Sequence, residues 1–405
     1  MKKKEEAKWQ KALLIIIMLL VSVSLIGGAA YFYGKSFRDI FTLMVISAAY
    51  LGAVIFSLIQ SNIYGELHYD NGGHYARFVI VFLFGTAVCC ILPSIPESGW
   101  AVPSVALALA LFSNTVTGIA AYAGLISICV YLASADILVF ALCFFTGCIF
   151  AILFEKLDDE YRTGIPMFIA MLIYIVSLTA KTVFQNKGVL SVEIFIVPIV
   201  NVFITYICML AVLRFYCTAV VDKEKGKYLA INDQEFKLLA KYKTEDKQLY
   251  YNAIHTAHFA EKTARMLHMD VDLAKNGGYY HRIIAAECNK KGKTLEEICK
   301  KYKFPPKAVQ LLQEYNYKNR PIKMRETAAV YIADSVVATL MYLNSKEEDD
   351  KNSEEIDYTK LVKAIIKRKI DSGVLSRSDI SLSDIGDFER IYAGENLYYD
   401  FLRRE

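Results

Sequence analysis

Apolar and polar positions divide the chain into two halves. The first half consists of long apolar runs separated by short polar stretches, and each run is long enough to cross a hydrocarbon core of about 30 Å at about 1.5 Å per residue. The runs are Ala12 to Tyr31, Ile40 to Leu58, Tyr75 to Leu92, Val102 to Leu132, Ile137 to Phe154, Ile165 to Val183 and Val192 to Tyr216. We therefore predict a transmembrane helical domain over residues 12–217.

The run from Val102 to Leu132 is too long for one crossing. The polar cluster Ser113-Asn114-Thr115 near its middle predicts a turn between two short spans, which brings the total to about eight. Residues 1–11 form a basic N-terminus with five lysines, and such segments stay in the cytoplasm. An even number of spans then places both termini on the cytoplasmic side of a multi-pass bacterial cell-membrane protein.

Ionisable groups inside spans would indicate a transport pathway, because they are costly there. We expect the charges of this half at span ends or in an outside loop: Asp136, Glu193, Arg214, Lys181 and Lys187. Asn114, Asn201, Pro103 and Pro198 fit helix packing and a turn, with a ligand cavity as the alternative.

The second half changes to an amphipathic pattern of 3.6-residue period. A linker over residues 218–228 is expected to lead into a cytoplasmic all-helical domain over residues 229–405. The predicted helices are Leu229 to Leu239, Tyr250 to Leu267, Thr294 to Tyr302, Pro306 to Tyr315, Arg325 to Leu343 and Tyr358 to Ile370. Turns are predicted at Asn276-Gly277-Gly278 and Phe304-Pro305-Pro306, and a solvated acidic loop at Asn344 to Asp357. The fold class is all-α throughout.

Composition agrees with this division. Of the 88 charged residues, 63 lie in residues 218–405, and the net charge of +4 forms no basic footprint for a nucleic-acid polymer. Seven of the nine cysteines fall in apolar segments. Neither a disulfide framework nor a zinc ribbon is therefore expected.

Several segments of the second half resemble the HD domain of the seven-transmembrane HD-domain proteins, a family of membrane cyclic-di-AMP phosphodiesterases. They are Phe259-Ala260-Glu261, Leu273-Ala274, Tyr279-Tyr280-His281, Ala333-Asp334-Ser335-Val336 and the closing run Val362 to Leu382. In that family a large extracellular domain separates the first two spans. Here only Gly34 to Asp39 stands between them.

The resemblance implies two divalent metals, iron or manganese, held by about seven imidazole and carboxylate ligands. Most of those positions are changed: Asn252 replaces the first histidine, the His-Asp pair is His281-Arg282, Ala285 replaces the following lysine, and Tyr315-Asn316 replace a pair of histidines. Only His281 and Asp334 survive as metal-ligand candidates. We therefore expect no catalytic residues and no metal cofactor.

Arg282 is the most informative departure, because a guanidinium is always charged and has no lone pair for a metal. We predict that it forms a salt bridge with Asp334 through two parallel hydrogen bonds, with His281 and Asn252 close by. In the alternative, Arg282 turns to solvent and Asp334 caps a helix.

A rearranged metal site is the second hypothesis, since His255 and His258 have a permissive His-x-x-His spacing. The favoured interpretation of these histidines is that they are ordinary residues on the surface of a helix. The favoured interpretation is an inactive membrane pseudo-phosphodiesterase in the lipid bilayer, which binds a cyclic dinucleotide, a lipid-soluble ligand or an active relative. An active phosphohydrolase and a small-molecule transporter with a helical accessory domain are the alternatives. The oligomeric state is left open.

Overall fold

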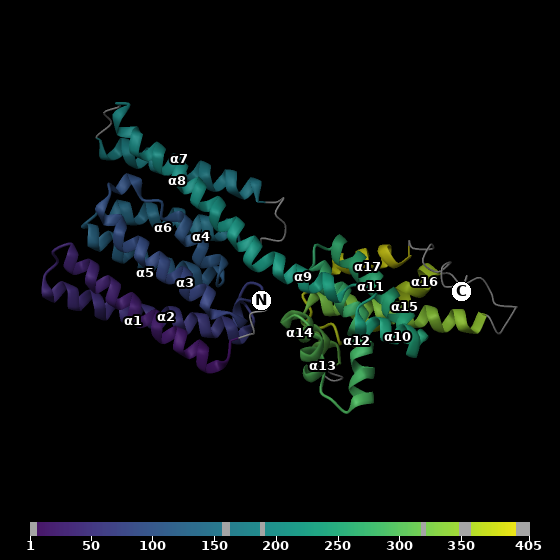
Figure 1. Cartoon of the computed structure of the whole chain (residues 1–405). Helices are drawn as coiled ribbons and strands as arrows, with labels where there is room; N and C mark the ends of the chain where they lie inside the picture. The colour runs from purple at the N-terminus through teal and green to yellow at the C-terminus, as the bar shows by residue number, and fades with distance from the viewer. Residues whose placement is uncertain (1–5, 156–162, 187–190, 317–320, 348–357, 394–405) are drawn as a thin grey trace. The chain divides into compact units, whose positions relative to one another are not determined.

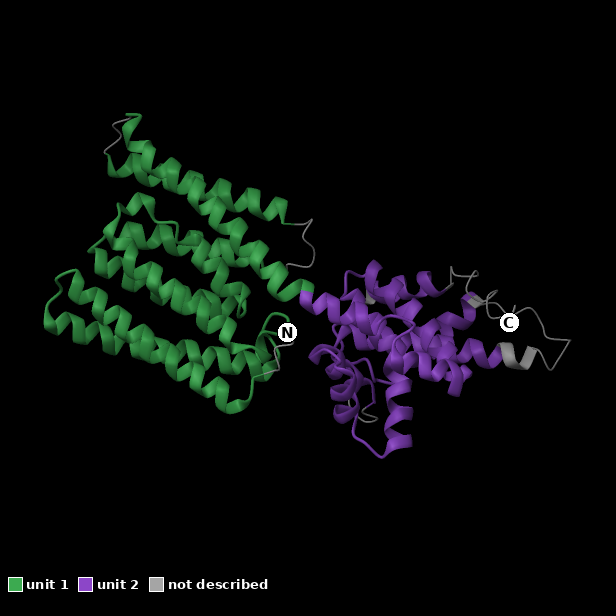
Figure 2. Cartoon of the chain, in the orientation of Figure 1, with its two compact units in different colours: residues 1–222 green, residues 223–405 purple. Residues whose placement is uncertain are grey.

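The computed structural model of the chain describes residues 6–155, 163–186, 191–316, 321–347 and 358–393 (Figure 1). Within these ranges the regular elements are all helices, as predicted. The chain forms two compact units, Met1–Asp222 and Lys223–Glu405 (Figure 2). Each unit is described by itself.

The first unit contains eight α-helices. Their bounds are α1 Lys8–Phe32, α2 Phe37–Tyr64, α3 Tyr75–Ile91, α4 Pro103–Leu111, α5 Thr115–Ala133, α6 Ile137–Leu153, α7 Gly164–Gln185 and α8 Glu193–Tyr216. Six of them are long and apolar enough to cross a membrane, and α6 is a shorter apolar helix. A seventh long candidate, Arg325–Leu343, lies in the second unit and has 61% of its residues buried there.

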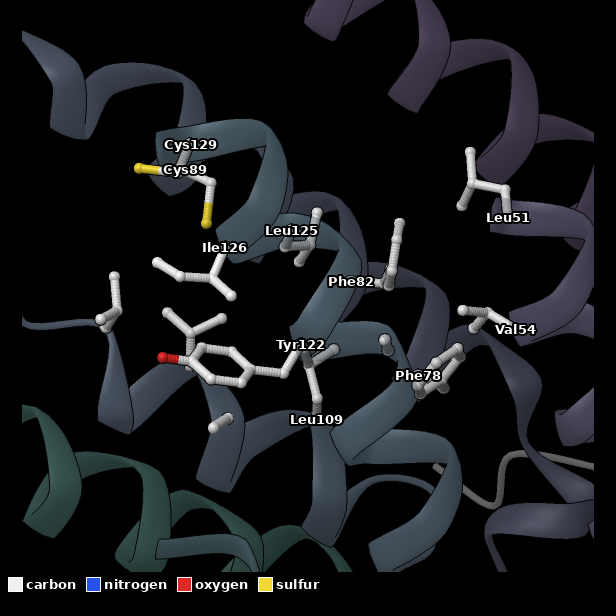
Figure 3. Packing of buried hydrophobic residues seen from close by; sticks show 14 of the residues in the cluster. Leu51, Val54, Phe78, Phe82, Cys89, Leu109, Tyr122, Leu125, Ile126 and Cys129 are labelled. Atoms are coloured by element: carbon white, nitrogen blue, oxygen red, sulfur yellow. The ribbon is translucent and has the colours of Figure 1, made fainter. Parts of the chain in front are cut away.

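The core of the first unit forms around α5. Tyr122, Leu125, Ile126 and Cys129 are at most 1% exposed and pack against side chains from α2, α3 and α4 (Figure 3). The hydroxyl of Tyr122 donates to the carbonyl of Cys143 on α6 at 2.7 Å. Many large apolar side chains of the unit instead remain exposed on its outside, as expected for surfaces covered by lipid.

Contacts between the connections show which helix ends lie together. At one end, Lys11 Nζ donates to the carbonyl of Gly72, and the ring of Tyr69 lies 6.1 Å from that of Tyr216. At the other end, Lys35 Nζ donates to Ser134 Oγ at 2.7 Å. The chain therefore enters α1 and leaves α8 at the same end of the unit, which agrees with an even number of passages. Which side of the membrane this end faces stays a prediction.

The fourth passage is broken. The short 3₁₀ turns η2 Leu92–Ser94 and η3 Glu97–Gly99 precede α4, and the nine residues of α4 cover only about 14 Å. The expectation of two short spans between Val102 and Leu132 is therefore corrected to a half-length helix and one full-length helix, α5. The turn between them is as predicted, since Asn114 caps α5 by accepting from the backbone N–H of Thr117 at 2.9 Å.

Asn201 on α8 compensates for the missing helical hydrogen bonds of the broken passage. Its Nδ2 donates to the carbonyl of Ser98 and to the hydroxyl of Tyr174, both at 2.8 Å. The Tyr174 hydroxyl in turn donates to the carbonyl of Trp100 at 3.2 Å. Irregular backbone at membrane depth needs such partners, so Asn201 serves helix packing here.

Lys181 lies inside α7, which corrects the expectation that it falls in an outside loop. Its side chain is 2% exposed, and Nζ lies 3.4 Å from Glu97 Oε2 in η3. The helix continues to Gln185, past the point where the apolar run ends at Val183. A hydropathy pattern assigns a lysine at the end of an apolar run to the following loop. Lys181 can stay buried in the helix because Glu97 is its ion-pair partner.

The second unit follows a π-helical turn, η5 Cys217–Val221. Its helices are α9 Asp222–Ile231, α10 Lys237–Glu245, α11 Lys247–Met266, α12 Val271–Lys291, α13 Leu295–Tyr302, α14 Pro306–Asn316, α15 Arg325–Glu347, α16 Tyr358–Asp371 and α17 Leu382–Ala393. Residues 218–228, expected as a linker, are thus helical. The predicted helix from Leu229 to Leu239 is interrupted between Ile231 and Lys237. Of the predicted acidic loop, residues 344–347 continue α15, and the rest lies outside the described residues.

The Asn276-Gly277-Gly278 turn is wrong, because α12 runs straight through it. These glycines serve packing: a Cβ on Gly278 would lie 2.3 Å from the Cα of Ala257, so only glycine lets α11 and α12 approach this closely. The Phe304-Pro305-Pro306 turn is confirmed, since α13 ends at Tyr302, its C-cap Lys303 has a φ of 65°, and α14 begins at Pro306. Close contact between α11 and α12 places the candidate site described next.

Candidate functional site

The candidate positions lie on α12 and on three helices that pack against it. Asn252, His255 and His258 are on α11, His281 and Arg282 on α12, Tyr315 on α14 and Asp334 on α15. The structure brings His281, Arg282, Tyr315 and Asp334 into direct contact. Asn252 is 4% exposed, and its amide oxygen has no hydrogen-bond partner among the described residues.

Asp334 is the centre of this cluster. The Nη2 of Arg282 lies 2.8 Å from Asp334 Oδ1 and donates to Oδ2 at 2.9 Å. The hydroxyl of Tyr315 donates to Oδ2 at 2.6 Å. One guanidinium nitrogen therefore straddles both carboxylate oxygens, and the two parallel hydrogen bonds expected from the sequence are not formed.

His281 fixes the other side of the carboxylate. The ring is completely buried, with Nδ1 2.8 Å from the carbonyl of Gly278 and Nε2 3.1 Å from Asp334 Oδ1. Each ring nitrogen is therefore directed at an oxygen atom of the protein.

Electrostatics keep Asp334 ionised. Burial raises its pKa, but the charges and hydrogen bonds of His281 and Arg282 outweigh burial and hold the pKa well below its ordinary value. Burial of Tyr315 and the neighbouring Asp334 carboxylate raise the pKa of the Tyr315 phenol, which therefore remains a hydrogen-bond donor. The cluster is thus a carboxylate that accepts hydrogen bonds from Arg282 and Tyr315 and has His281 Nε2 beside it.

This arrangement does not fit the pair of metals that the resemblance implies. The two residues that survive as candidate ligands, His281 and Asp334, are engaged with each other, and the Arg282 guanidinium places a fixed positive charge against the carboxylate. Among the described residues, no three His, Cys, Asp or Glu side chains gather as a metal site would require. No step of a reaction can be assigned to a metal here.

The rearranged site on α11 lacks an anionic ligand. Glu261, one turn beyond His258, forms salt bridges with Lys275 at 2.8 Å and with Arg265 at 3.1 Å. Burial, together with the neighbouring His258, lowers the pKa of His255 to about 4. His255 is 3% exposed and so belongs to the core of the unit, not to its surface as expected.

Sequence analysis missed Tyr315 as a partner of Asp334. Its ring also packs edge-on against His281, with the ring centroids 4.9 Å apart. The resemblance had singled out position 315 only as a changed metal ligand. A phenol is a neutral donor that a buried carboxylate can accept from.

Arg282 differs from its neighbours in exposure. Its side chain is 41% exposed, whereas that of Asp334 is 8% exposed and that of His281 is buried. The guanidinium is anchored on its inner side by the carboxylate, and the rest of the group reaches solvent. An anchored, partly exposed guanidinium is well suited to contact a phosphate.

Comparison with known proteins gives limited results. No family model and no curated protein matches the chain. Among solved structures, the crystal structure of the L. monocytogenes phosphodiesterase PgpH HD domain aligns with 42% of this chain and 99% of its own, at 17% identity and a TM-score of 0.32. The same HD domain in complex with cyclic-di-AMP aligns with 42% of this chain and 97% of its own, at 16% identity and a TM-score of 0.31.

Proposed function

We propose that this chain is a multi-pass membrane protein whose second unit is an HD-like domain that binds and does not hydrolyse its ligand. The observation that carries the proposal is the Arg282–Asp334 contact. It puts a permanent cation where a metal site would need a ligand. The two remaining ligand candidates then stabilise each other instead of holding a metal.

A nucleotide with phosphodiester groups, such as a cyclic dinucleotide, is the ligand class that this geometry favours. Arg282 is held by Asp334 and is 41% exposed, so it can contact a phosphate without first being ordered. On α11, the side-chain oxygens of Asn252 and Thr256 are buried without hydrogen-bond partners among the described residues. They lie one helical turn apart inside the unit, where they provide acceptors for a buried water.

The test uses the purified full-length protein. Metal content is measured after loading with Mn²⁺ or Fe²⁺, and cyclic-di-AMP hydrolysis and binding are measured on the same sample, with the L. monocytogenes PgpH HD domain as a positive control. We expect no stoichiometric metal, no hydrolysis and measurable binding. Two bound metals per chain with manganese-dependent hydrolysis would contradict the proposal.

The site variant is Arg282→Ala and its matched control is Arg265→Ala. Arg265 has the same chemistry but lies on α11 with 71% of its side chain exposed, paired only with Glu261 in the same helix. We expect Arg282→Ala to weaken cyclic-di-AMP binding at least tenfold and Arg265→Ala to leave it within twofold. Equal effects would show that Arg282 does not contact the ligand.

One observation would favour a transporter: Lys181 is buried beside the broken passage. However, Lys181 and Glu97 neutralise each other at 3.4 Å, and the Lys181 side chain is 2% exposed. A transport site needs access for its substrate. The pair is therefore better explained as support for the broken passage.

A further inference from the structure

The first unit contains a cavity of about 570 Å³ at the end opposite to the N-terminus. It lies between the connection from α1 to α2 and the connection from α5 to α6, and its lining includes Lys35, Asp39, Tyr131 and Ser134. Helix ends surround it, so its depth is that of the membrane surface. Its volume is within the range of small-molecule sites.

One wall of the cavity is charged. Lys35 Nζ donates to Ser134 Oγ at 2.7 Å and lies 5.1 Å from the ring centroid of Tyr131. Among the described residues no carboxylate lies within 4 Å of this ammonium, so two of its three donors are available. Asp39 accepts from the hydroxyl of Ser36 through Oδ2 at 2.7 Å. Its Oδ1 makes no hydrogen bond within the described part of the chain.

The apolar wall of the cavity is formed by Val130, Ile137 and Phe140, and Ile137 is 74% exposed at the start of α6. On the two helices joined by the connection from α1 to α2, Tyr31 and Phe37 are 79% and 85% exposed. Exposed aromatic side chains at helix ends are typical of the membrane–water interface.

We propose that this cavity binds a phospholipid with a phosphoethanolamine headgroup. Lys35 and Ser134 face the phosphate, and the free oxygen of Asp39 accepts from the primary ammonium. The apolar wall contacts the first part of an acyl chain. A site with one free cation and one free anion is matched by a zwitterion, whereas an anionic lipid would be repelled by Asp39 and a choline has no N–H to donate to it.

The experiment uses the full-length protein, delipidated in detergent and titrated with phosphatidylethanolamine, phosphatidylcholine or phosphatidylglycerol of the same acyl chains. Binding is read by native mass spectrometry and by the shift in thermal unfolding. We expect phosphatidylethanolamine to bind at least tenfold more tightly than the other two lipids. Equal affinities for the three would overturn the proposal.

Two variants assign the headgroup contacts. Lys35→Gln should weaken phosphatidylethanolamine binding at least tenfold, and Lys35→Arg should retain it. Asp39→Asn should remove the preference over phosphatidylglycerol, and Asp39→Glu should keep it. If Lys35→Gln binds as the wild type does, the phosphate contact is refuted.

Arg38→Gln is the matched control, because Arg38 lies in the same short segment but does not line the cavity. It should leave all three affinities within twofold. Soluble glycerophosphoethanolamine distinguishes a lipid from a free headgroup. It should bind at least a hundredfold more weakly than the lipid, and equally tight binding would show that the occupant is a soluble metabolite and not a lipid.

Discussion

Replacing Arg282 with alanine tests whether the guanidinium has taken over the stabilising role of a metal. The change leaves the Asp334 carboxylate, 8% exposed, without its guanidinium partner. Breaking a fully buried ion pair costs about 3 to 5 kcal/mol, and breaking an exposed pair costs less than about 1 kcal/mol. Arg282 is 41% exposed, and His281 and Tyr315 still contact the carboxylate. We therefore expect a loss of about 2 kcal/mol in the free energy of unfolding of the second unit.

The loss should depend on pH in a defined direction. The pKa of Asp334 lies well below its ordinary value, because His281 and Arg282 outweigh the effect of burial. A carboxylate with a depressed pKa stabilises the folded state above its unfolded pKa, about 3.9, and this contribution is lost as the pH falls toward the folded pKa. The difference between wild type and Arg282→Ala should be constant from about pH 5 to pH 8 and shrink below about pH 4.

Labelling of Cys299 provides the assay. This thiol is 1% exposed in the core of the second unit, so it reacts only after the unit opens. Its modification is followed by peptide mass spectrometry across a urea series of the full-length protein. A loss of about 2 kcal/mol corresponds to about a 30-fold increase in the opened fraction. Arg265→Ala is the control, and an Arg282→Ala effect no larger than that of the control, or one that grows below pH 4, would refute the reasoning.

Three further predictions concern packing and hydrogen bonds. Tyr315→Phe removes the 2.6 Å hydrogen bond to Asp334 and should cost about 1 kcal/mol in the same Cys299 assay. Gly278→Val should prevent α11 from packing on α12, since a Cβ would lie 2.3 Å from Ala257; we expect Cys299 to be labelled without urea, and native-like protection would contradict the packing argument. Asn201→Leu leaves the Ser98 carbonyl without its 2.8 Å donor, so the thermal unfolding temperature of the first unit in detergent should fall, whereas Asn201→Gln should retain part of the stability.

Much of the fold could be predicted because hydrophobic length and period report burial directly. The apolar runs gave the spans, and the polar cluster at Asn114 gave the turn before α5. The broken passage could not be predicted, because the residues that complete it are distant in sequence: Asn201 is 103 positions from Ser98, and Tyr174 is 74 positions from Trp100. The same holds for Lys181, whose place inside α7 depends on Glu97.

Glycine gave a misleading signal for the same reason. The local sequence around Gly277 and Gly278 predicts a turn. In the structure their lack of a side chain is used between helices, where the backbone of Ala257 occupies the space a Cβ would need. A helical glycine that permits close packing and a glycine that ends a helix have the same local sequence, so only the tertiary contact distinguishes them.

The candidate site was more predictable than the packing, because it depends on charge. A buried Asp334 needs a positive partner. The resemblance to HD domains implied that residues 282 and 334 converge, and the charge of Arg282 then predicted the salt bridge. The geometry of the salt bridge could not be predicted. A single guanidinium nitrogen lies within 3 Å of both Asp334 oxygens, because Tyr315 and His281 already contact the same carboxylate. Arg282→Asp would therefore bring two carboxylates together without enough histidines to hold a metal. We expect it to destabilise the second unit more than Arg282→Ala does.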